Sequence, residues 1–215
     1  MTSPSFGPAE FQRSANVSRE TLDRLKLFVT LLEDWSARHN LVSAASLQQV
    51  WNRHIWDSAQ LFDLIPSDAA SLVDLGSGAG FPGLILGFLL RERPGFRTVL
   101  YEATRKKCAF LAAAAERLGV AAEIRNSRIE AARPEPFDVV TARACAPLSR
   151  LLLYAQAFQG PHTVNLFLKG QSVGAELTEA YKIWNMQAKE RASRSDPSGK
   201  VLTIGRFEPK AGRRA

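Results

Sequence analysis

The chain has 215 residues, 46% of them hydrophobic and 23% charged, which predicts one soluble globular α/β domain with a short additional segment. Its two cysteines, Cys108 and Cys145, are too few for a disulfide framework and lack metal-ligand spacing, so we expect a reducing cytoplasm rather than a secreted scaffold. Residues 1–13 lack a signal-peptide pattern, and the longest apolar run, residues 81–90, is too short to span a bilayer, so we expect no membrane association.

Residues 1–66 are predicted to form a helical segment. Ser18 can cap a helix whose apolar side chains recur at helical spacing: Leu22, Leu25, Phe28, Leu32 and Trp35. Ser46 can cap a second helix that Pro66 ends, with one stripe formed by Leu47, Val50, Trp51, His54, Ile55, Ser58, Leu61, Phe62 and Ile65. Two helices cannot bury their stripes alone, so the segment must pack on the rest of the chain. The ends, residues 2–8 and 210–215, are expected to be loose.

Residues 67–215 form the predicted core, in which strands and helices alternate. The strands are expected at 71–75, 97–102, 122–126, 137–142 and 164–169, and the helices at 82–92, 105–118 and 148–158. This βαβ alternation predicts a mainly parallel sheet with helices on both faces.

The end of the core has a different pattern. A helix is expected at 176–183, and two extended stretches at 184–191 and 201–207 are joined by the turn sequence Asp196-Pro197-Ser198-Gly199. The sheet should therefore finish with an antiparallel hairpin at one edge.

The stretch most informative about function is residues 72–83, where an apolar run ends in Asp74 and is followed by Gly76, Gly78 and Gly80. Glycine lets the backbone adopt positive φ and approach a ligand closely. Pro82 suits the first turn of a helix, whose free N–H groups and partial positive charge face the same place. This strand, turn and helix predict a site for a nucleotide-like small molecule.

In doubly wound sheets the ligand lies beyond the carboxyl ends of the strands. The residues delivered there are Asp74 and the Gly76–Gly80 turn, Glu102, Ile129 with Glu130, Arg143, and Lys169 with Gly170. An unpaired arginine is costly to bury, which favours a place for Arg143 at the site, facing a cofactor, a phosphate or a base. The same reasoning applies to Lys169.

Two cofactors fit this pattern. Gly78, Gly80 and Gly83 form a G-x-G-x-x-G dinucleotide fingerprint with Glu102 about twenty residues further on. However, an anionic Asp74 beside the turn would repel a pyrophosphate and favour an amino group. S-adenosylmethionine has no phosphate, and Glu102 is placed to accept hydrogen bonds from both of its ribose hydroxyls. We therefore favour S-adenosylmethionine.

Beyond this pattern, the chain resembles one family over residues 25–207. The motifs that carry the resemblance are Asn40-Leu41-Val42-Ser43, Arg53-His54-Ile55-Trp56-Asp57-Ser58, Val73 to Gly83, Lys106 to Leu111, Ser127 to Glu130, Thr141-Ala142-Arg143-Ala144 and Leu168-Lys169-Gly170. The chain is similar to the RsmG/GidB family, the 16S rRNA (guanine-N7)-methyltransferases; Val42 stands where that family usually has threonine.

The resemblance implies a Rossmann-like class I S-adenosylmethionine-dependent methyltransferase fold with a seven-stranded sheet. It also implies methyl transfer to N7 of a guanine in the 530-loop of 16S rRNA, in free RNA or in the small subunit. Guanine N7 has a free lone pair, so we expect in-line transfer without a general base, a covalent intermediate or a metal. A monomer would suffice.

These expectations assign residues to roles. The expected cofactor residues are Asp74, Gly76, Gly78, Gly80, Phe81, Glu102, Ile129, Glu130 and Arg143. The candidates for positioning the reactants are Arg143, His54 and Lys169. The expected RNA contacts are Arg53, Arg105, Lys106 and Lys169, and further basic candidates are Arg13, Arg38, Arg143, Arg150 and the 210–214 tail.

Several residues keep a simpler structural explanation. His54 lies on the apolar stripe and could be a core histidine bonded to Asp57 or Ser58, and Arg53 could pair with Asp57. Cys145 lies where a pyrimidine methylase has its nucleophile, but no accompanying motif supports that role. The net charge of +7 is compatible with RNA binding, although a dispersed surplus would serve only solubility.

Two other functions remain compatible with the sequence. One is a dinucleotide-binding oxidoreductase or regulator, and the other is a methyltransferase that acts on a small molecule.

Overall fold

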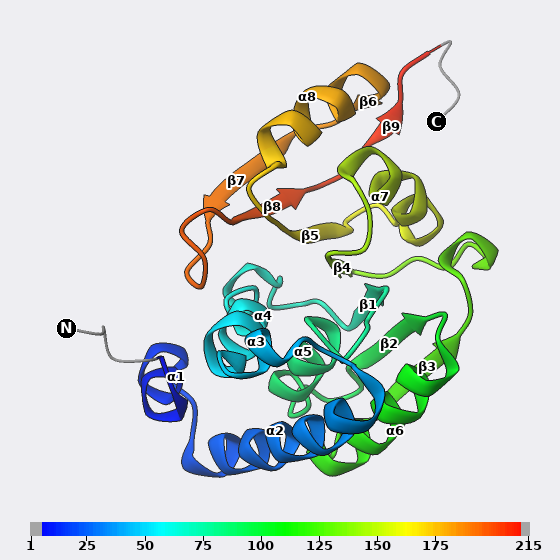
Figure 1. The fold of residues 1–215 in the computed structure, drawn as a ribbon. Coiled ribbons are helices and arrows are strands. Elements are labelled where there is room, and N and C mark those ends of the chain that lie inside the picture. The colour runs from blue at the N-terminus through cyan, green and yellow to red at the C-terminus, as the bar shows by residue number, and fades with distance from the viewer. Residues whose placement is uncertain (1–5, 212–215) are drawn as a thin grey trace.

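A computed structural model describes residues 6–211 and has an α/β architecture built on a seven-stranded sheet of order β3-β2-β1-β4-β5-β8-β7 (Figure 1). The strands are β1 (Ser71–Leu75), β2 (Arg97–Glu102), β3 (Ala122–Asn126), β4 (Val139–Arg143), β5 (Val164–Lys169), β7 (Ala188–Ala192) and β8 (Lys200–Ile204). The first five are parallel, while β8 runs antiparallel to β5 and β7. The predicted parallel sheet with an antiparallel edge hairpin is confirmed.

Helices cover both faces of this sheet. The helices of the core are α5 (Gly83–Leu89), α6 (Arg105–Leu118), α7 (Leu148–Ala155) and α8 (Val173–Ile183). Side chains alternate along a strand, so β2 sends Leu100 to the face covered by α5 and α6, and Val99 to the face covered by α7 and α8. Strands β2 and β3 are added on one side of β1, and β4 and β5 on the other, so the order of strands reverses at β1. Doubly wound folds bind their ligands at this point of the sheet.

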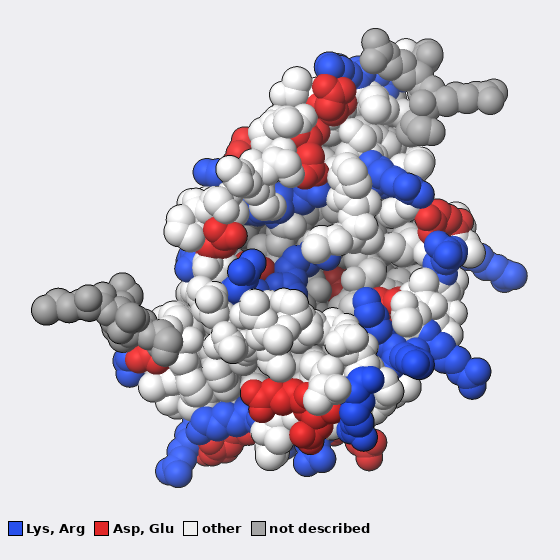
Figure 2. Space-filling model, viewed as in Figure 1, with Lys and Arg blue, Asp and Glu red and all other residues white. Residues whose placement is uncertain are grey.

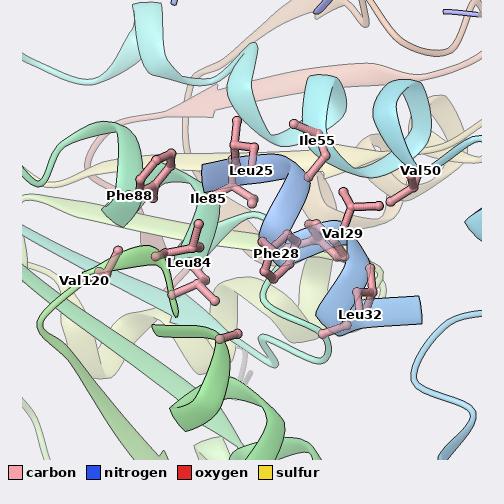
Figure 3. Packing of buried hydrophobic residues seen from close by; sticks show 14 of the residues in the cluster. Leu25, Phe28, Val29, Leu32, Val50, Ile55, Leu84, Ile85, Phe88 and Val120 are labelled. Atoms are coloured by element: carbon pink, nitrogen blue, oxygen red, sulfur yellow. The ribbon is translucent and has the colours of Figure 1, made fainter. Parts of the chain in front are cut away.

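The N-terminal helices pack on the α5–α6 face. The long helix α2 (Arg19–His39) begins at Ser18, whose hydroxyl accepts a hydrogen bond from the Thr21 amide, as predicted. It lies along α6, and its buried residues meet α5 as well (Figure 3). Phe28 is fully buried and contacts the rings of both Phe81 and Phe110 at centroid distances of 5.7 and 6.1 Å. Packing on α2 therefore supports the turn that carries Phe81.

The second predicted helix is not continuous, and its cap is Ser43 rather than Ser46. Ser43 accepts from the Ser46 amide and starts the short α3. The chain then forms α3 (Ala44–Leu47), the π-helical turn η1 (Trp51–Trp56), α4 (Asp57–Ala59) and the 3₁₀ turn η2 (Phe62–Leu64). Val50, Ile55 and Leu61 are buried, so the apolar stripe is real. A π-helical turn is wider than an α-helical one and is often found at functional sites. Three residues of η1, namely Asn52, Arg53 and His54, line a cavity of this protein.

Other boundaries differ by a few residues. Helix α1 (Pro8–Ala15) was not predicted, because its only fully buried side chain is Phe11 and its apolar pattern is short. Helix α5 ends at Leu89 instead of residue 92, β4 runs two residues later at its start, and α8 begins at Val173 instead of 176. The 184–191 stretch divides into β6 (Trp184–Asn185), which pairs with β9 (Glu208–Pro209), and β7. The ends expected to be loose were residues 2–8 and 210–215; Pro8 instead begins α1, and residues 1–5 and 212–215 lie outside the described residues.

Replacing Phe28 with alanine should lower the free energy of unfolding by about 3–5 kcal/mol, because a fully buried ring leaves a cavity between α2, α6 and the turn. Urea unfolding followed by circular dichroism measures this change. Leu27, which is 49% exposed on the same helix, is the matched control, and Leu27→Ala should have little effect. Equal losses for the two variants would contradict this packing.

Candidate active site at the carboxyl ends of the parallel strands

A cavity of about 950 Å³ opens where the sequence places the ligand. Its wall consists of the helical segment from Leu41 to Asp57, the glycine turn, the ends of β4 and β5, and the loop between β7 and β8. Basic side chains line it from several elements: Arg53, Lys107 on α6, Arg143, Lys169 and Lys200. Figure 2 shows Lys and Arg side chains inside a hollow on this face of the molecule.

The glycine turn has the backbone that the sequence predicted. Gly76, Gly78 and Gly80 adopt φ values of +72°, +57° and +92°, which side-chain-bearing residues rarely tolerate. Gly76 and Gly78 line the cavity, and so does Phe81. Gly80 does not; a Cβ there would lie 3.0 Å from Leu84, so its role in this structure is close packing. The turn thus presents bare backbone to the cavity.

Asp74 lies beneath this turn rather than on the cavity wall. Its side chain is fully buried, and its Oδ1 accepts a hydrogen bond of 2.7 Å from the Thr141 hydroxyl on β4. A Cβ on Gly83 would come within 2.3 Å of the Asp74 Cβ, so glycine is required for helix α5 to begin against this carboxyl group. The expected direct contact of Asp74 with a cofactor amino group stays a prediction, and the contacts seen here are internal ones.

Burial changes the acidity of Asp74. Desolvation raises the pKa of this carboxyl group to about 6, against the opposing hydrogen bond from Thr141. Its Oδ2 has no hydrogen-bond partner among the described residues. Ionised Asp74 is therefore a source of instability in this structure, which a nearby positive charge would relieve.

Glu102 is held rigidly at the end of β2. Its Oε2 accepts a hydrogen bond of 3.0 Å from the Gly78 amide, and its Oε1 accepts one of 2.7 Å from the Thr104 amide. The side chain is buried beside the glycine turn, and its contact with a ribose diol stays a prediction. Of the two residues expected near an adenine, Ile129 is half-buried, while Glu130 is exposed and accepts from the Tyr154 hydroxyl at 2.7 Å.

Arg143 is paired with residues that the sequence could not connect. Its Nη1 donates to the Arg53 carbonyl oxygen at 2.7 Å and to Asp57 Oδ2 at 3.3 Å. Its Nη2 lies 2.7 Å from His54 Nδ1, and its guanidinium lies over the Phe81 ring. The suggested Arg53–Asp57 and His54–Asp57 pairs are therefore wrong, because Arg143 occupies the Asp57 carboxylate and the His54 acceptor.

His54 is a neutral acceptor at this site. Its ring stacks on Phe81 with centroids 4.7 Å apart. Burial lowers the pKa of His54 to about 3, and the charges of Arg143 and Arg53 act in the same direction. Because Arg143 donates to Nδ1, the proton of the neutral ring resides on Nε2, which is buried without a partner among the described residues.

Lys169 is committed to an internal ion pair. Its Nζ lies 2.6 Å from Glu176 Oε2 and donates to the Ala146 carbonyl oxygen at 2.8 Å, with only 7% of the side chain exposed. Glu176 also accepts from the Leu148 amide. Lys169 lines the cavity but is not a free cation at its mouth, so this geometry does not favour the expected phosphate contact.

The remaining basic candidates are exposed. Arg53 is exposed and lines the cavity, whereas Arg105 and Lys106 are exposed at the start of α6 and do not. Arg13 and Arg150 pair with nearby carboxylates, Arg13 with Glu10 and Arg150 with Glu130. Sequence reasoning missed Lys107, Asp57 and the β7–β8 loop as parts of the cavity.

Cys145 has the properties of a packed thiol. Burial raises the pKa of Cys145 to about 11, with Asp74 as the next contributor, so the thiol is protonated at neutral pH. A Cβ on Gly76 would lie 3.0 Å from its sulfur, which places the thiol behind the glycine turn. No group of three His, Cys, Asp or Glu side chains within residues 6–211 could hold a metal ion. The helices of this part of the chain are each too short or too polar to cross a membrane.

Replacing Asp74 with asparagine should change how stability depends on pH. The folded-state pKa of about 6 exceeds the ordinary 3.8, so the folded protein binds this proton more tightly, and the native chain loses stability as pH rises from about 4 to above 6. Relative to the Asn variant, the loss between pH 4 and 8 should reach about 2 kcal/mol. Urea unfolding at several pH values measures it. Both proteins contain His54, so their difference isolates Asp74, and a difference independent of pH would contradict the burial argument.

Comparison with known proteins identifies the family. The family model described as GidB, rRNA small subunit methyltransferase G, matches residues 21–199. "Ribosomal RNA small subunit methyltransferase G" of Parvibaculum lavamentivorans is 49% identical over 90% of this chain and 87% of its own length. The protein of the same name from Rhodospirillum rubrum is 47% identical over 92% of this chain and 96% of its own length.

Solved structures support the fold. An O-methyltransferase from Bacillus cereus in complex with SAH superposes with a TM-score of 0.60 at 17% identity, covering 92% of this chain and 97% of that one. Cofactor-bound Rv0187 from MTB superposes with a TM-score of 0.62 at 16% identity, covering 95% of this chain and 98% of that one. Sheet, cavity and sequence agree, and the chain belongs to the RsmG/GidB family of rRNA small subunit methyltransferases.

Proposed function

We propose that the chain transfers the methyl group of S-adenosylmethionine to N7 of a guanine in the 530-loop of 16S rRNA. The observation that carries this proposal is the glycine turn at positive φ, set against the fixed carboxylate of Glu102 in a chain of this family. The names of its relatives, rRNA small subunit methyltransferases, support the rRNA substrate.

The residues around the turn fit S-adenosylmethionine better than a dinucleotide. Gly78 donates its amide to Glu102, so a carboxylate already occupies the place where a pyrophosphate would need free N–H groups. A ribose diol, in contrast, donates hydrogen bonds to a carboxylate. The buried Asp74 adds negative charge behind the turn, which suits a cofactor with a sulfonium and an amino group. This favours a methyltransferase over a dinucleotide-binding oxidoreductase or regulator.

The bound cofactor would supply an electrophilic methyl group next to the turn. Guanine N7 loses no proton on methylation, so the protein must align the reactants and exclude water. The side chains agree with this requirement. His54 is neutral and its Nδ1 is filled by Arg143, which leaves no basic nitrogen on this ring for a general base. The protonated thiol of Cys145 is a poor nucleophile.

The cavity also suits a nucleotide within a polyanion. Within the described part of the chain, Arg53, Lys107 and Lys200 line it without the ion pairs that occupy Arg143 and Lys169. Their positive charge would attract phosphates near the target base and make binding depend on salt concentration. We propose 16S rRNA or the small ribosomal subunit as the partner, in the cytoplasm, with the enzyme acting as a monomer.

Small ribosomal subunits from cells that lack this methyltransferase should accept labelled methyl groups from S-adenosylmethionine in the presence of the purified chain. The label should map to N7-methylguanine in the 530-loop, because that base is the proposed target. Primer extension after cleavage at N7-methylguanine locates it, and subunits that already carry the modification are the control. Label at another atom or another loop would contradict the substrate assignment, and label on a small molecule alone would favour the alternative methyltransferase.

Replacing Glu102 with glutamine should weaken binding of S-adenosylmethionine by about tenfold or more, because hydrogen bonds to a charged group are stronger than those to a neutral one. Glutamine retains an oxygen that can accept from one of the two amides, which limits damage to the turn. Isothermal titration calorimetry measures the dissociation constant. Glu116→Gln, at an exposed position on α6, is the control, and equal affinities for the two variants would show that Glu102 does not hold the cofactor.

A further inference from the structure

The loop between β7 and β8, residues 193–199, is hydrogen-bonded to residues 52 and 60 of the N-terminal segment, which lies beside it at the cavity. Asn52 Nδ2 donates to the Ser195 carbonyl oxygen at 2.9 Å. Gln60 donates from Nε2 to the Ser193 hydroxyl at 3.1 Å and accepts from the Arg194 amide at 2.8 Å. The tip of an edge hairpin is usually a free loop. This hairpin loop is instead anchored to the neighbouring wall of the cavity.

Asp57 stands at the centre of this anchor. Its Oδ1 accepts from the Ser195 hydroxyl and, at 2.9 Å, from Gln60 Nε2. Its Oδ2 accepts from Arg143 Nη1 on the other side. The Asp57 side chain is only 15% exposed, so solvent screens these contacts weakly. One carboxylate therefore holds the hairpin loop with one oxygen and the arginine at the end of β4 with the other.

From Arg143 the contacts continue to the cofactor side. Its guanidinium lies over Phe81 and beside His54, which itself stacks on Phe81. Phe81 follows the glycine turn directly and lines the cavity. A continuous series of contacts thus runs from the hairpin loop through Asp57, Arg143 and Phe81 to the glycine turn.

Asp57 supplies the negative charge that compensates Arg143. A buried guanidinium is costly unless an anion and acceptors compensate it. Of the other carboxylates that line the cavity, Glu176 is taken by Lys169, and Asp196 accepts from Ser198 within the hairpin loop. Asp57 is the carboxylate that pairs with Arg143 among the described residues.

We propose that Asp57 is a positioning residue that joins the hairpin loop to Arg143, so that the loop forms the substrate-side wall of the active site. Ser193, Ser195, Asp196 and Pro197 line the cavity from this loop, and Arg53 and the glycine turn line the same cavity. The target nucleotide would lie between this wall and the cofactor. This proposal rests on the proposed function for its substrate, but the anchoring itself does not.

The contacts of the two Asp57 oxygens, with Ser195 and with Arg143, can be removed separately by substitution. Ser195→Ala removes the loop contact and leaves Asp57 with Arg143. Asp57→Asn can still accept from Ser195 at its oxygen, but it turns an amide donor toward Arg143. Asp57→Ala removes both contacts, and Asp57→Glu restores the charge. Asp63→Asn is the control, since exposed Asp63 pairs with Arg194 of the same loop but does not line the cavity.

Kinetics on small subunits test the wall. Ser195→Ala should lower kcat/KM about tenfold, mainly through KM, and Asp57→Asn should lower it at least as much through kcat as well. The double variant should be little worse than Asp57→Asn, because both act through one carboxylate. Asp57→Glu should recover part of the loss. Additive losses, or a Ser195→Ala variant indistinguishable from Asp63→Asn, would overturn the proposal.

Hydrogen exchange tests the anchor without any substrate. In Asp57→Ala, the amides of Arg194 and Ser195 should exchange at least about tenfold faster than in the native chain, while Asp63→Asn changes them much less. Unchanged exchange in Asp57→Ala would overturn the anchor. If the native chain methylates no rRNA, the proposed function fails, and the exchange rates still decide whether Asp57 anchors the loop.

Discussion

The close packing of the start of helix α5 against strand β1 is the constraint that shapes both sides of the site. Helix α5 begins so near β1 that a Cβ on Gly83 would come within 2.3 Å of Asp74. The turn that precedes it contains Gly76, Gly78 and Gly80 at positive φ, and it brings the Gly78 amide to the carboxylate that ends β2. The same turn sets Phe81 against His54 and Arg143. Cofactor side and substrate side thus share one piece of backbone.

The charge states of the site are consequences of burial at this turn. Asp74 and His54 are both buried, and burial moves their pKa values in opposite directions, toward the neutral form of each. The charge of Arg143 is compensated by the Asp57 carboxylate that faces it. The site therefore contains the cation of Arg143 paired with the carboxylate of Asp57, while the buried His54 stays neutral. This arrangement suits methylation of a ring nitrogen with a free lone pair.

Much of the fold could be predicted from sequence because local pattern and tertiary packing agree there. The bounds of β1, β2, β3, β5 and α6 match the prediction residue for residue, since buried apolar runs, the Gly119 cap and short turns delimit them. The places of the glycine turn after β1 and of Glu102 at the end of β2 could be predicted because the bounds of these strands are clear from the sequence. The continuous helix predicted after Ser46 was wrong, because its apolar periodicity is present but does not encode the breaks between α3, the π-helical η1, α4 and η2.

The charged residues of the site were harder to place. Helical spacing suggested that Arg53 pairs with Asp57, but Arg143, which lies 86 positions away along the chain, supplies the partner. Lys169 ends a strand as predicted, yet Glu176 from α8 takes its charge. Such ion pairs depend on which elements the fold brings together, and local sequence patterns do not predict contacts between residues far apart in the chain. The same limit hid the β7–β8 loop, whose composition shows only a turn.

A crystal structure of the chain with S-adenosylhomocysteine would show whether the glycine turn and Glu102 form the cofactor site. We expect the ribose hydroxyls to lie on the Glu102 carboxylate and the ligand to run along Gly76 and Gly78. Its sulfur should face the part of the cavity bounded by Phe81 and Arg143. A ligand bound elsewhere, or a cavity left empty at saturating concentration, would contradict this arrangement.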